Sequence, residues 1–417
     1  MTPERVFQVL LVAGVAAGGW LYGDYWKKNG LSQDDQEGAA ELRAQNSELT
    51  RRLDELTDEL AQVRSILKSG PYPVSDADIS WVEEEHAMVF RKPPNVRLAS
   101  PTEMGEAVAR NLEFIHGEKG LDDEGKAWEF LGILPPGQRL KAQIVSVESS
   151  GAKGVFDLTT GRILLSEKFD QESVPDRSLL IRLLGQQLSL QNHPRKSWKS
   201  RDEWQAWQAV HVGAAAAMEA RFLKRAALAN QAGWGNPEPA REELLRNLAP
   251  ALGGFCNFPF LEGSNYARFH FAESVQRFTE MFRNPPETTR EILYPGQEVS
   301  VSDGIEKPAE LSDAEVAFSN NLGELGVRLW LDPFIGNEEA EQLASNWGAD
   351  RYFLVKETAS LSIIWQFRGR EEAMTSKFAE VIREQVLPEL KALQPDRKLE
   401  IRLRENLITL TNTPKPK

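Results

Sequence analysis

The stretch that organises this chain is LLIRLLGQQLSLQNH, residues 179–193. Its apolar residues at positions 180, 183, 184 and 188 keep a helical spacing, which predicts a helix with one buried face. A proline cannot continue a helix, so Pro194 is expected to end it. A second helical stretch, 204–225, contains VHVGAAAAME at 210–219. We therefore expect two consecutive helices at the centre of the fold.

Taken together, the two helices resemble the active-site helices of a family of bacterial extracytoplasmic zinc metallopeptidases of gluzincin-like type. Members of that family read HExxHALQDQ on the first helix and ALxEGDA on the second. Here Leu190 and Gln191 match the LQ of the first motif. Ala209, Gly213 and Ala215 match the A, G and A of the second. The resemblance implies a zincin-like α+β fold.

The residues that carry the chemistry of that family are missing here. The alignment places the two metal-binding histidines on Leu184 and Leu188, the general-base glutamate on Gly185 and the third ligand on Val212. A zinc peptidase needs imidazoles at i and i+4, a third ligand and a carboxylate that activates water. The resemblance thus implies a degenerate site with no metal or other cofactor, in which the leucine and valine side chains converge in the core.

Composition limits the classes of function. The chain has 417 residues, 41% hydrophobic and 27% charged, which indicates a globular protein with a sizeable core. A net charge of -13 argues against a nucleic-acid partner, because no basic excess is left to neutralise phosphates. With the single cysteine Cys256 there is no intramolecular disulfide framework, and five histidines offer little material for a metal site.

The N-terminal stretch 6–23 is apolar apart from Gln8 and just long enough to span a bilayer. An uncleaved transmembrane anchor is preferred to a cleaved signal peptide, because the positive region before it is only Arg5 and the amino terminus. Lys27 and Lys28 follow the stretch, so positive charges flank both of its ends and the positive-inside rule does not decide its orientation in the membrane. Since the resemblance favours export of the C-terminal part, we expect a single-pass membrane protein of the bacterial envelope with an extracytoplasmic globular part.

Residues 39–67 carry four heptads with apolar residues at the a and d positions, which predicts a coiled coil. Asn46 falls at an a position, where a buried amide fixes register and favours two parallel strands. The alternative is a solitary amphipathic helix packed on the globular domain. We favour a homodimer through the coiled coil, because the other faces of the helix are almost wholly polar.

Further motifs follow in the order of the family. Residues 153–165 predict a β-hairpin that resembles the family's GxYDPxTG segment and contains Asp157. This is either an ordinary hairpin or a strand that pairs with an extended substrate. Residues 283–295 resemble YRNPPxSTEQILHP, with Tyr294 in place of a histidine that the resemblance assigns to the substrate cleft. The candidate cleft residues are therefore Asp157, His193, His211 and Tyr294. Other expected elements are helices over 104–114, 122–131, 260–281 and 371–384, strands over 352–356 and 361–367, and a hairpin through 398–411.

The predicted organisation is therefore a transmembrane anchor at 1–30, a coiled coil at 31–70 and a degenerate metallopeptidase-like domain at 71–417. The predicted fold class is α+β and zincin-like, a mostly helical domain with a small mixed sheet. Its helical core is expected at about 100–300 and its α+β C-terminal part at about 310–412.

Three functions compete. The first is a membrane-anchored, catalytically inactive pseudopeptidase that binds an unknown polypeptide partner or acts as a scaffold. The second is an active metalloenzyme with a relocated metal site, for which His193 and His211 with Glu219 or Asp157 are the candidate residues. The third is a purely architectural envelope protein. An apolar groove where the catalytic cleft should lie would favour binding over architecture.

Overall fold

The computed structural model describes residues 42, 44–57, 71–228, 245, 248–297, 304–312, 315–357 and 360–415. The chain divides into two compact units, Met1–Gly70 and Pro71–Lys417.

In the first unit, residues 44–57 are helical, as the heptad pattern predicts. Leu53 and Leu56, at a and d positions, are 37% and 58% exposed in the single chain. The charged side chains pair along the helix, as with Arg51 and Glu55 at 2.5 Å. Helix formation is thus confirmed over these residues, whereas dimerisation stays a prediction.

The predicted anchor requires a correction. Among the described residues, no helix combines the length and the apolar character needed to cross a bilayer, and the stretch 6–23 lies outside them. The structure supports an α+β fold with two sheets, not the predicted fold class with its leading transmembrane helix. It gives no support to a single-pass membrane protein.

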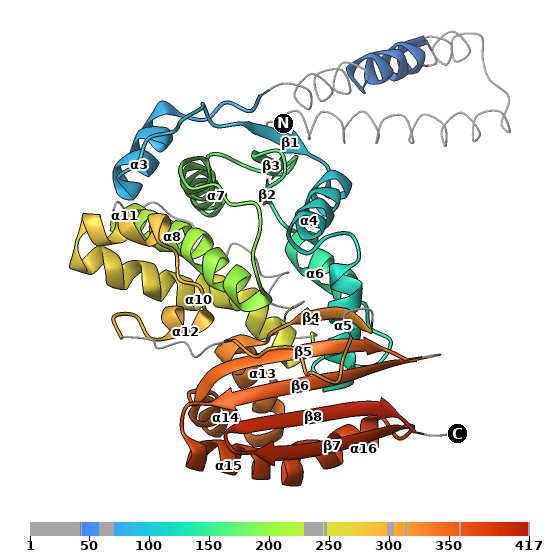
Figure 1. The fold of residues 1–417 in the computed structure, drawn as a ribbon. Helices are drawn as coiled ribbons and strands as arrows, with labels where there is room; N and C mark the ends of the chain where they lie inside the picture. The colour runs from blue at the N-terminus through green and yellow to red at the C-terminus, as the bar shows by residue number, and fades with distance from the viewer. Residues whose placement is uncertain are drawn as a thin grey trace, which may run out of the picture. The chain divides into compact units, whose positions relative to one another are not determined.

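The first half of the second unit is mainly helical, with a small sheet at one end (Figure 1). Its elements are α3 (Asp76–His86), β1 (Val96–Ala99), α4 (Pro101–His116), α5 (Gly120–Leu131), α6 (Leu140–Ser149), β2 (Gly154–Asp157), β3 (Arg162–Ser166), α7 (Val174–Asn192), α8 (Arg201–Leu228), α10 (Pro250–Glu273), α11 (Val275–Arg283) and α12 (Thr289–Leu293). The sheet is mixed, in the order β1-β3-β2, with β1 parallel and β2 antiparallel to β3.

The second half contains a five-stranded sheet and the helices that pack on it. The strand order is β4-β5-β6-β8-β7, and every neighbouring pair is antiparallel. This half comprises β4 (Val316–Asn320), α13 (Gly323–Ile335), α14 (Asn337–Ala344), β5 (Trp347–Lys356), β6 (Leu361–Gly369), α15 (Glu372–Val381), a π-helical turn (Ile382–Val386), α16 (Leu387–Leu393), β7 (Arg397–Arg404) and β8 (Leu407–Pro414). Helix α15 packs on β6, β7 and β8, while α5 of the first half contacts β4, β5 and β6.

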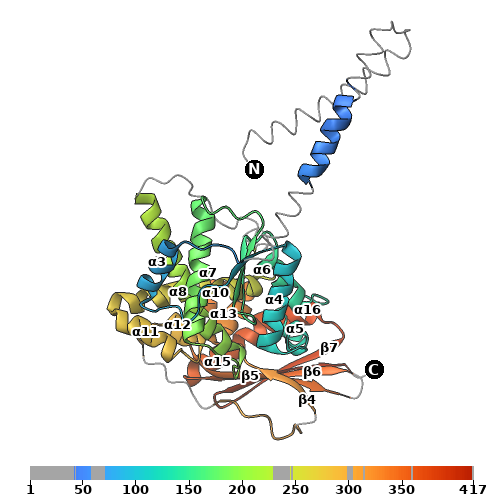
Figure 2. The same cartoon turned by 90° about the horizontal axis from the view of Figure 1, so that it is seen from above.

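Viewed from above, α7 and α10 lie between α3, α8 and α11 on one side and α4, α5 and α6 on the other (Figure 2).

Local sequence explains where several of the helices begin and end. Ser100 and Glu103 form a capping box at the start of α4, and Thr288 and Glu291 form another at α12. The single helix expected over 260–281 is two helices, because Ser274 is extended and caps α11 through the amide of Arg277.

Candidate functional site

One face of α7 packs against α8. Ser178 Oγ donates to Glu219 Oε1 at 3.1 Å, and Arg182 Nε lies 3.1 Å from Glu219 Oε2. One turn further along α7, Gly185 lies against Ala215. After another turn, Ser189 Oγ lies 2.9 Å from His211 Nδ1. Positions 178, 182, 185 and 189 recur every three or four residues, so this stripe is the face that α8 covers.

The positions aligned with the metal ligands lie on another face. Leu184 and Leu188 are fully buried in an apolar cluster with Ile163 and Leu165 of β3. A helix turns about 100° per residue, which carries both leucines away from the α8 face and towards the small sheet. Val212 instead lines a cavity on the other side of α7. The predicted convergence of the three side chains is wrong, because the α7 stripe that faces α8 is built from Arg182, Gly185 and Ser189.

Gly185 is the residue aligned with the family's general-base glutamate, and it lies against the imidazole of His86 from α3. A Cβ at position 185 would lie 2.6 Å from His86 Cε1 and 3.0 Å from Nε2. His86 is fully buried, its Nδ1 lies 3.2 Å from the carbonyl oxygen of Val82, and burial lowers its pKa to about 4. A neutral imidazole therefore fills the space beside this glycine. No motif in the sequence connects His86 to α7.

We expect Gly185→Ala to destabilise the protein by about 1–3 kcal/mol, because the added methyl group collides with a ring that is buried on all sides. Chemical denaturation of the full chain measures this difference. In a His86→Ala background the same substitution should be much less destabilising, because the ring is gone. Equal effects in both backgrounds would show that the ring is not the obstacle.

The two histidines proposed for a relocated metal site contact aromatic rings. His193 stacks on Phe282 with ring centroids 5.8 Å apart, and His211 lies 5.4 Å from the same ring and 4.5 Å from Trp207. His211 is buried, and burial with the charges of His193 and His86 lowers its pKa to about 3. Its Nε2 has no hydrogen-bond partner within the described structure.

The carboxylates proposed for that site are engaged elsewhere. Burial alone would raise the pKa of Asp157, but hydrogen bonds from Thr159 and Arg110 hold it below the usual value. Glu219 is held by α7, as described above. No three or more His, Cys, Asp or Glu residues among those described form a group that could hold a metal ion.

The fourth cleft candidate, Tyr294, lies far along the chain from the two helices. It ends α12, its ring is 5.1 Å from the Arg290 guanidinium, and its pKa is raised by burial first and by Glu324 second. It belongs to a polar network between the halves of the unit and does not line the cavity described next.

A cavity of about 200 Å³ lies between α4, α6, α7, α8, α10 and β2. Its wall is mainly apolar. The residues that line it include Val108, Leu112 and Ile115 of α4, Leu183, Gln186 and Leu190 of α7, Arg201, Trp204, Gln208, His211 and Val212 of α8, and Phe255 and Phe260 of α10. The α8 residues 201 and 212 are eleven positions apart, so the cavity follows α8 for about 16 Å. It is therefore elongated.

One end of the cavity carries a buried charge. The Arg201 guanidinium donates through Nη1 to Glu124 Oε2 at 3.0 Å and lies 5.0 Å and 5.1 Å from the ring centres of Trp128 and Phe255. Glu124 is fully buried, also accepts from the Tyr352 hydroxyl at 3.3 Å, and has its pKa raised by burial. Arg201 Nε has no partner among the described atoms.

The edge of β2 that borders the cavity is covered by a side chain. Ser166 N donates to the carbonyl of Lys153, so by strand alternation residues 154, 156 and 158 direct their backbone groups outwards. Asn111 of α4 donates to the carbonyl of Phe156 and accepts from the amide of Leu158, both at 2.8 Å. An extended peptide cannot pair with β2 at these two positions without displacing Asn111.

Comparisons with family models, with curated proteins and with solved structures find no match to this chain. The resemblance to zinc metallopeptidases therefore stays a prediction from its short motifs. Sequence reasoning missed the pair of Arg201 and Glu124. The only sequence signal for it is a charged residue in each of two helical stretches, which does not distinguish a buried charge from an exposed one.

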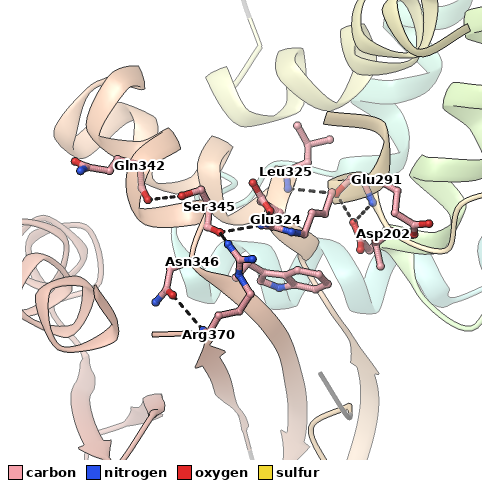
Figure 3. A network of polar contacts seen from close by, with 12 residues as sticks. Asp202, Glu291, Glu324, Leu325, Gln342, Ser345, Asn346 and Arg370 are labelled. Carbon is pink, nitrogen blue, oxygen red and sulfur yellow. Dashed lines mark hydrogen bonds and ion pairs between the residues drawn. The ribbon is translucent and has the colours of Figure 1, made fainter. Parts of the chain in front are cut away.

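A network of buried polar groups joins the two halves of the unit (Figure 3). Asp202 of α8 accepts from the amide of Thr289 at 3.1 Å and from its hydroxyl at 2.5 Å. Glu324 of α13 pairs with Arg290, which also donates to the carbonyl of Ser345 at 2.8 Å. These contacts fix α12 and α13 against the start of α8.

Asp202 predicts a pH dependence of stability. Burial raises its pKa from 3.8 to about 8, so between these values the folded protein binds more protons than the unfolded chain. Stability should fall as pH rises from 5 to 8, by at most about 1.4 kcal/mol per pH unit from this group. Asp202→Asn should flatten the profile, as thermal melts at each pH would show. An unchanged slope in the variant would assign the dependence to other groups.

Proposed function

We propose that residues 71–417 act as a non-catalytic binding module that takes an apolar group of its ligand into the cavity along α8. The observation that carries the proposal is the elongated apolar cavity with unpartnered donors or acceptors on Arg201 and His211. A polypeptide partner would enter it through a side chain, because Asn111 occupies the adjacent strand edge.

Binding of 1-octanol, a neutral apolar probe, tests this proposal. Trp204 and Trp207 line the cavity, so occupancy should change tryptophan fluorescence of the full chain. Val212→Trp should abolish the response by filling the cavity, whereas Val275→Trp should not, because Val275 is 51% exposed on α11. Absence of octanol binding, or equal binding by both variants, would overturn the proposal. Casein cleavage that depends on added zinc would instead favour a metalloenzyme.

We also propose that the chain is a parallel homodimer through the helix of the first unit. Leu42, Leu53 and Leu56 lie on the predicted seam and are 59%, 37% and 58% exposed in the single chain, so a second copy would bury them. Light scattering should give twice the chain mass for residues 31–417 and one chain mass for residues 71–417. Asn46→Leu should raise stability and loosen the choice of oligomer. The same number of chains per particle for residues 31–417 and for residues 71–417 would contradict the dimer.

A further inference from the structure

The cavity has a chemical direction along its length. At the Arg201 end the wall carries a guanidinium that is 5% exposed, together with His116. Burial lowers the pKa of His116 to about 3, so its imidazole adds no positive charge at neutral pH. Beyond this end, aliphatic and aromatic side chains of α4 and α8 alternate with the uncharged polar residues Gln205 and Gln208. The other arginine of the wall, Arg182 of α7, is paired with Glu219. A ligand that matches both parts has one anionic end and an apolar body.

One donor of the guanidinium on the side that suits a carboxylate has no partner within the described structure. Glu124 takes the Nη1 donor at 3.0 Å, while Nε has no partner in the described part of the chain. The side-on fork of an arginine consists of Nε–H and Nη2–H, and a carboxylate can accept from both donors at once. The rings of Trp128 and Phe255 hold the guanidinium plane in place. The fork is thus oriented before a ligand arrives.

The shape favours a linear hydrocarbon over a peptide chain. The cavity follows α8 for about 16 Å and has a volume of only about 200 Å³. Its cross-section is therefore small, and it forms a narrow channel. A peptide backbone would need a partner for every amide and carbonyl along the channel, and the nearest strand edge, which could supply them in series, is taken by Asn111. A hydrocarbon chain has no such groups to satisfy.

We propose that the cavity binds a linear aliphatic carboxylate of medium length, with the carboxylate on the Arg201 fork and the chain along α8 towards Val212. This inference rests on the proposed function and names the ligand class of the same site.

The test compares head groups and chain lengths on the full chain by calorimetry, below micelle-forming concentrations. Dodecanoate should bind about tenfold or more tightly than 1-dodecanol, because only the carboxylate is itself charged and has two oxygens that accept from both donors of the fork. From hexanoate to dodecanoate, affinity should rise about fourfold per methylene and then stop rising as the channel is filled. Dodecylamine should bind more weakly than the alcohol.

Two variants locate the ligand. Arg201→Lys keeps a cation for Glu124 but loses the fork, so the preference for dodecanoate over 1-dodecanol should fall at least fivefold. Gln208→Phe narrows the wall at a partly exposed position and should weaken both ligands equally. If Arg201→Lys does not fold, the head-group series on the unmodified chain decides by itself.

The outcomes separate the two proposals. Equal binding of dodecanoate and 1-dodecanol, both weakened by Gln208→Phe, would overturn the carboxylate assignment and leave the binding module standing. Failure of both ligands to bind would overturn both. A preference for dodecanoate that Arg201→Lys leaves unchanged would place the carboxylate elsewhere and overturn this inference.

Discussion

Gly213→Ala should destabilise the protein by about 3 kcal/mol or more, the upper part of the range for overpacked cores. Gly213 of α8 and Gly263 of α10 lie where the two helices cross. A Cβ at position 213 would be 2.5 Å from the Cα of Gly263, and other Gly263 backbone atoms are nearer still. Backbone cannot rotate aside as a flexible side chain can, so the helices would have to separate.

The reciprocal substitution tests the same crossing from the other helix. A Cβ at position 263 would meet the backbone of Ala209, with its Cα at 3.0 Å. Gly263→Ala should therefore be similarly destabilising, and the double variant should lose less than the sum of the two, since the helices separate only once. Urea denaturation of the full chain, followed by tryptophan fluorescence, measures all three.

Gly105→Ala is the matched control. Gly105 lies within α4, and a Cβ there would have only Ser149 Oγ nearby, at 3.6 Å. The substitution should stabilise the helix by about 0.5–1 kcal/mol, because alanine loses less backbone entropy on folding than glycine. A Gly213→Ala variant as stable as the control would mean that α8 and α10 do not cross at this distance.

The helices of the centre were predictable because apolar spacing is a local property. Residues 179–192 fall within α7 and 204–225 within α8, and the strands of the hairpin at 153–165 are β2 and β3. The helices over 104–114 and 122–131 are confirmed as parts of α4 and α5. Capping residues and prolines near these boundaries carry the same local information.

Which face of α7 meets α8 was not predictable, and the error at the candidate site follows from it. Leucines at 180, 183, 184 and 188 mark a broad buried surface, but α7 is covered by α3, α8 and the small sheet together. Small residues at 178, 185 and 189 decide the contact with α8, because they permit close approach. Hydrophobic spacing identifies burial and does not identify the partner.

The polar residues that give the site its character depend on contacts distant in the sequence. Arg201 and Glu124 are 77 positions apart and come from different helices, and Asn111 reaches β2 across 45 positions. A charged residue in a sequence is ordinarily read as exposed, so neither member of the ion pair is recognisable without the other. Only the packing of α4, α5 and α8 around the cavity brings them together.

Arg201→Met should destabilise the protein by about 3–5 kcal/mol at neutral pH, because it leaves the fully buried Glu124 carboxylate without its cation. Burial already raises the pKa of Glu124, and removal of the arginine raises it further, so the variant can take up a proton instead of holding a bare charge. The folded variant then binds more protons than its unfolded chain. Its loss of stability should therefore grow as pH rises above the ordinary glutamate range.

Glu124→Gln reverses the situation, since it leaves the guanidinium without its anion, and its effect should depend little on pH because arginine does not titrate. The double variant Arg201→Met/Glu124→Gln removes both charges and should be more stable than either single variant, as found where buried ion pairs are replaced by neutral residues. Thermal melts at pH 5 and pH 8 measure the stability of the two single variants and the double variant.

Lys398→Met is the control, because its pair with Glu400 is 58% and 38% exposed and should contribute at most about 1 kcal/mol. A double variant less stable than both singles would show that the pair is held for the hydrogen bond from Tyr352 and the ring contacts of Arg201, and not for mutual neutralisation of two buried charges.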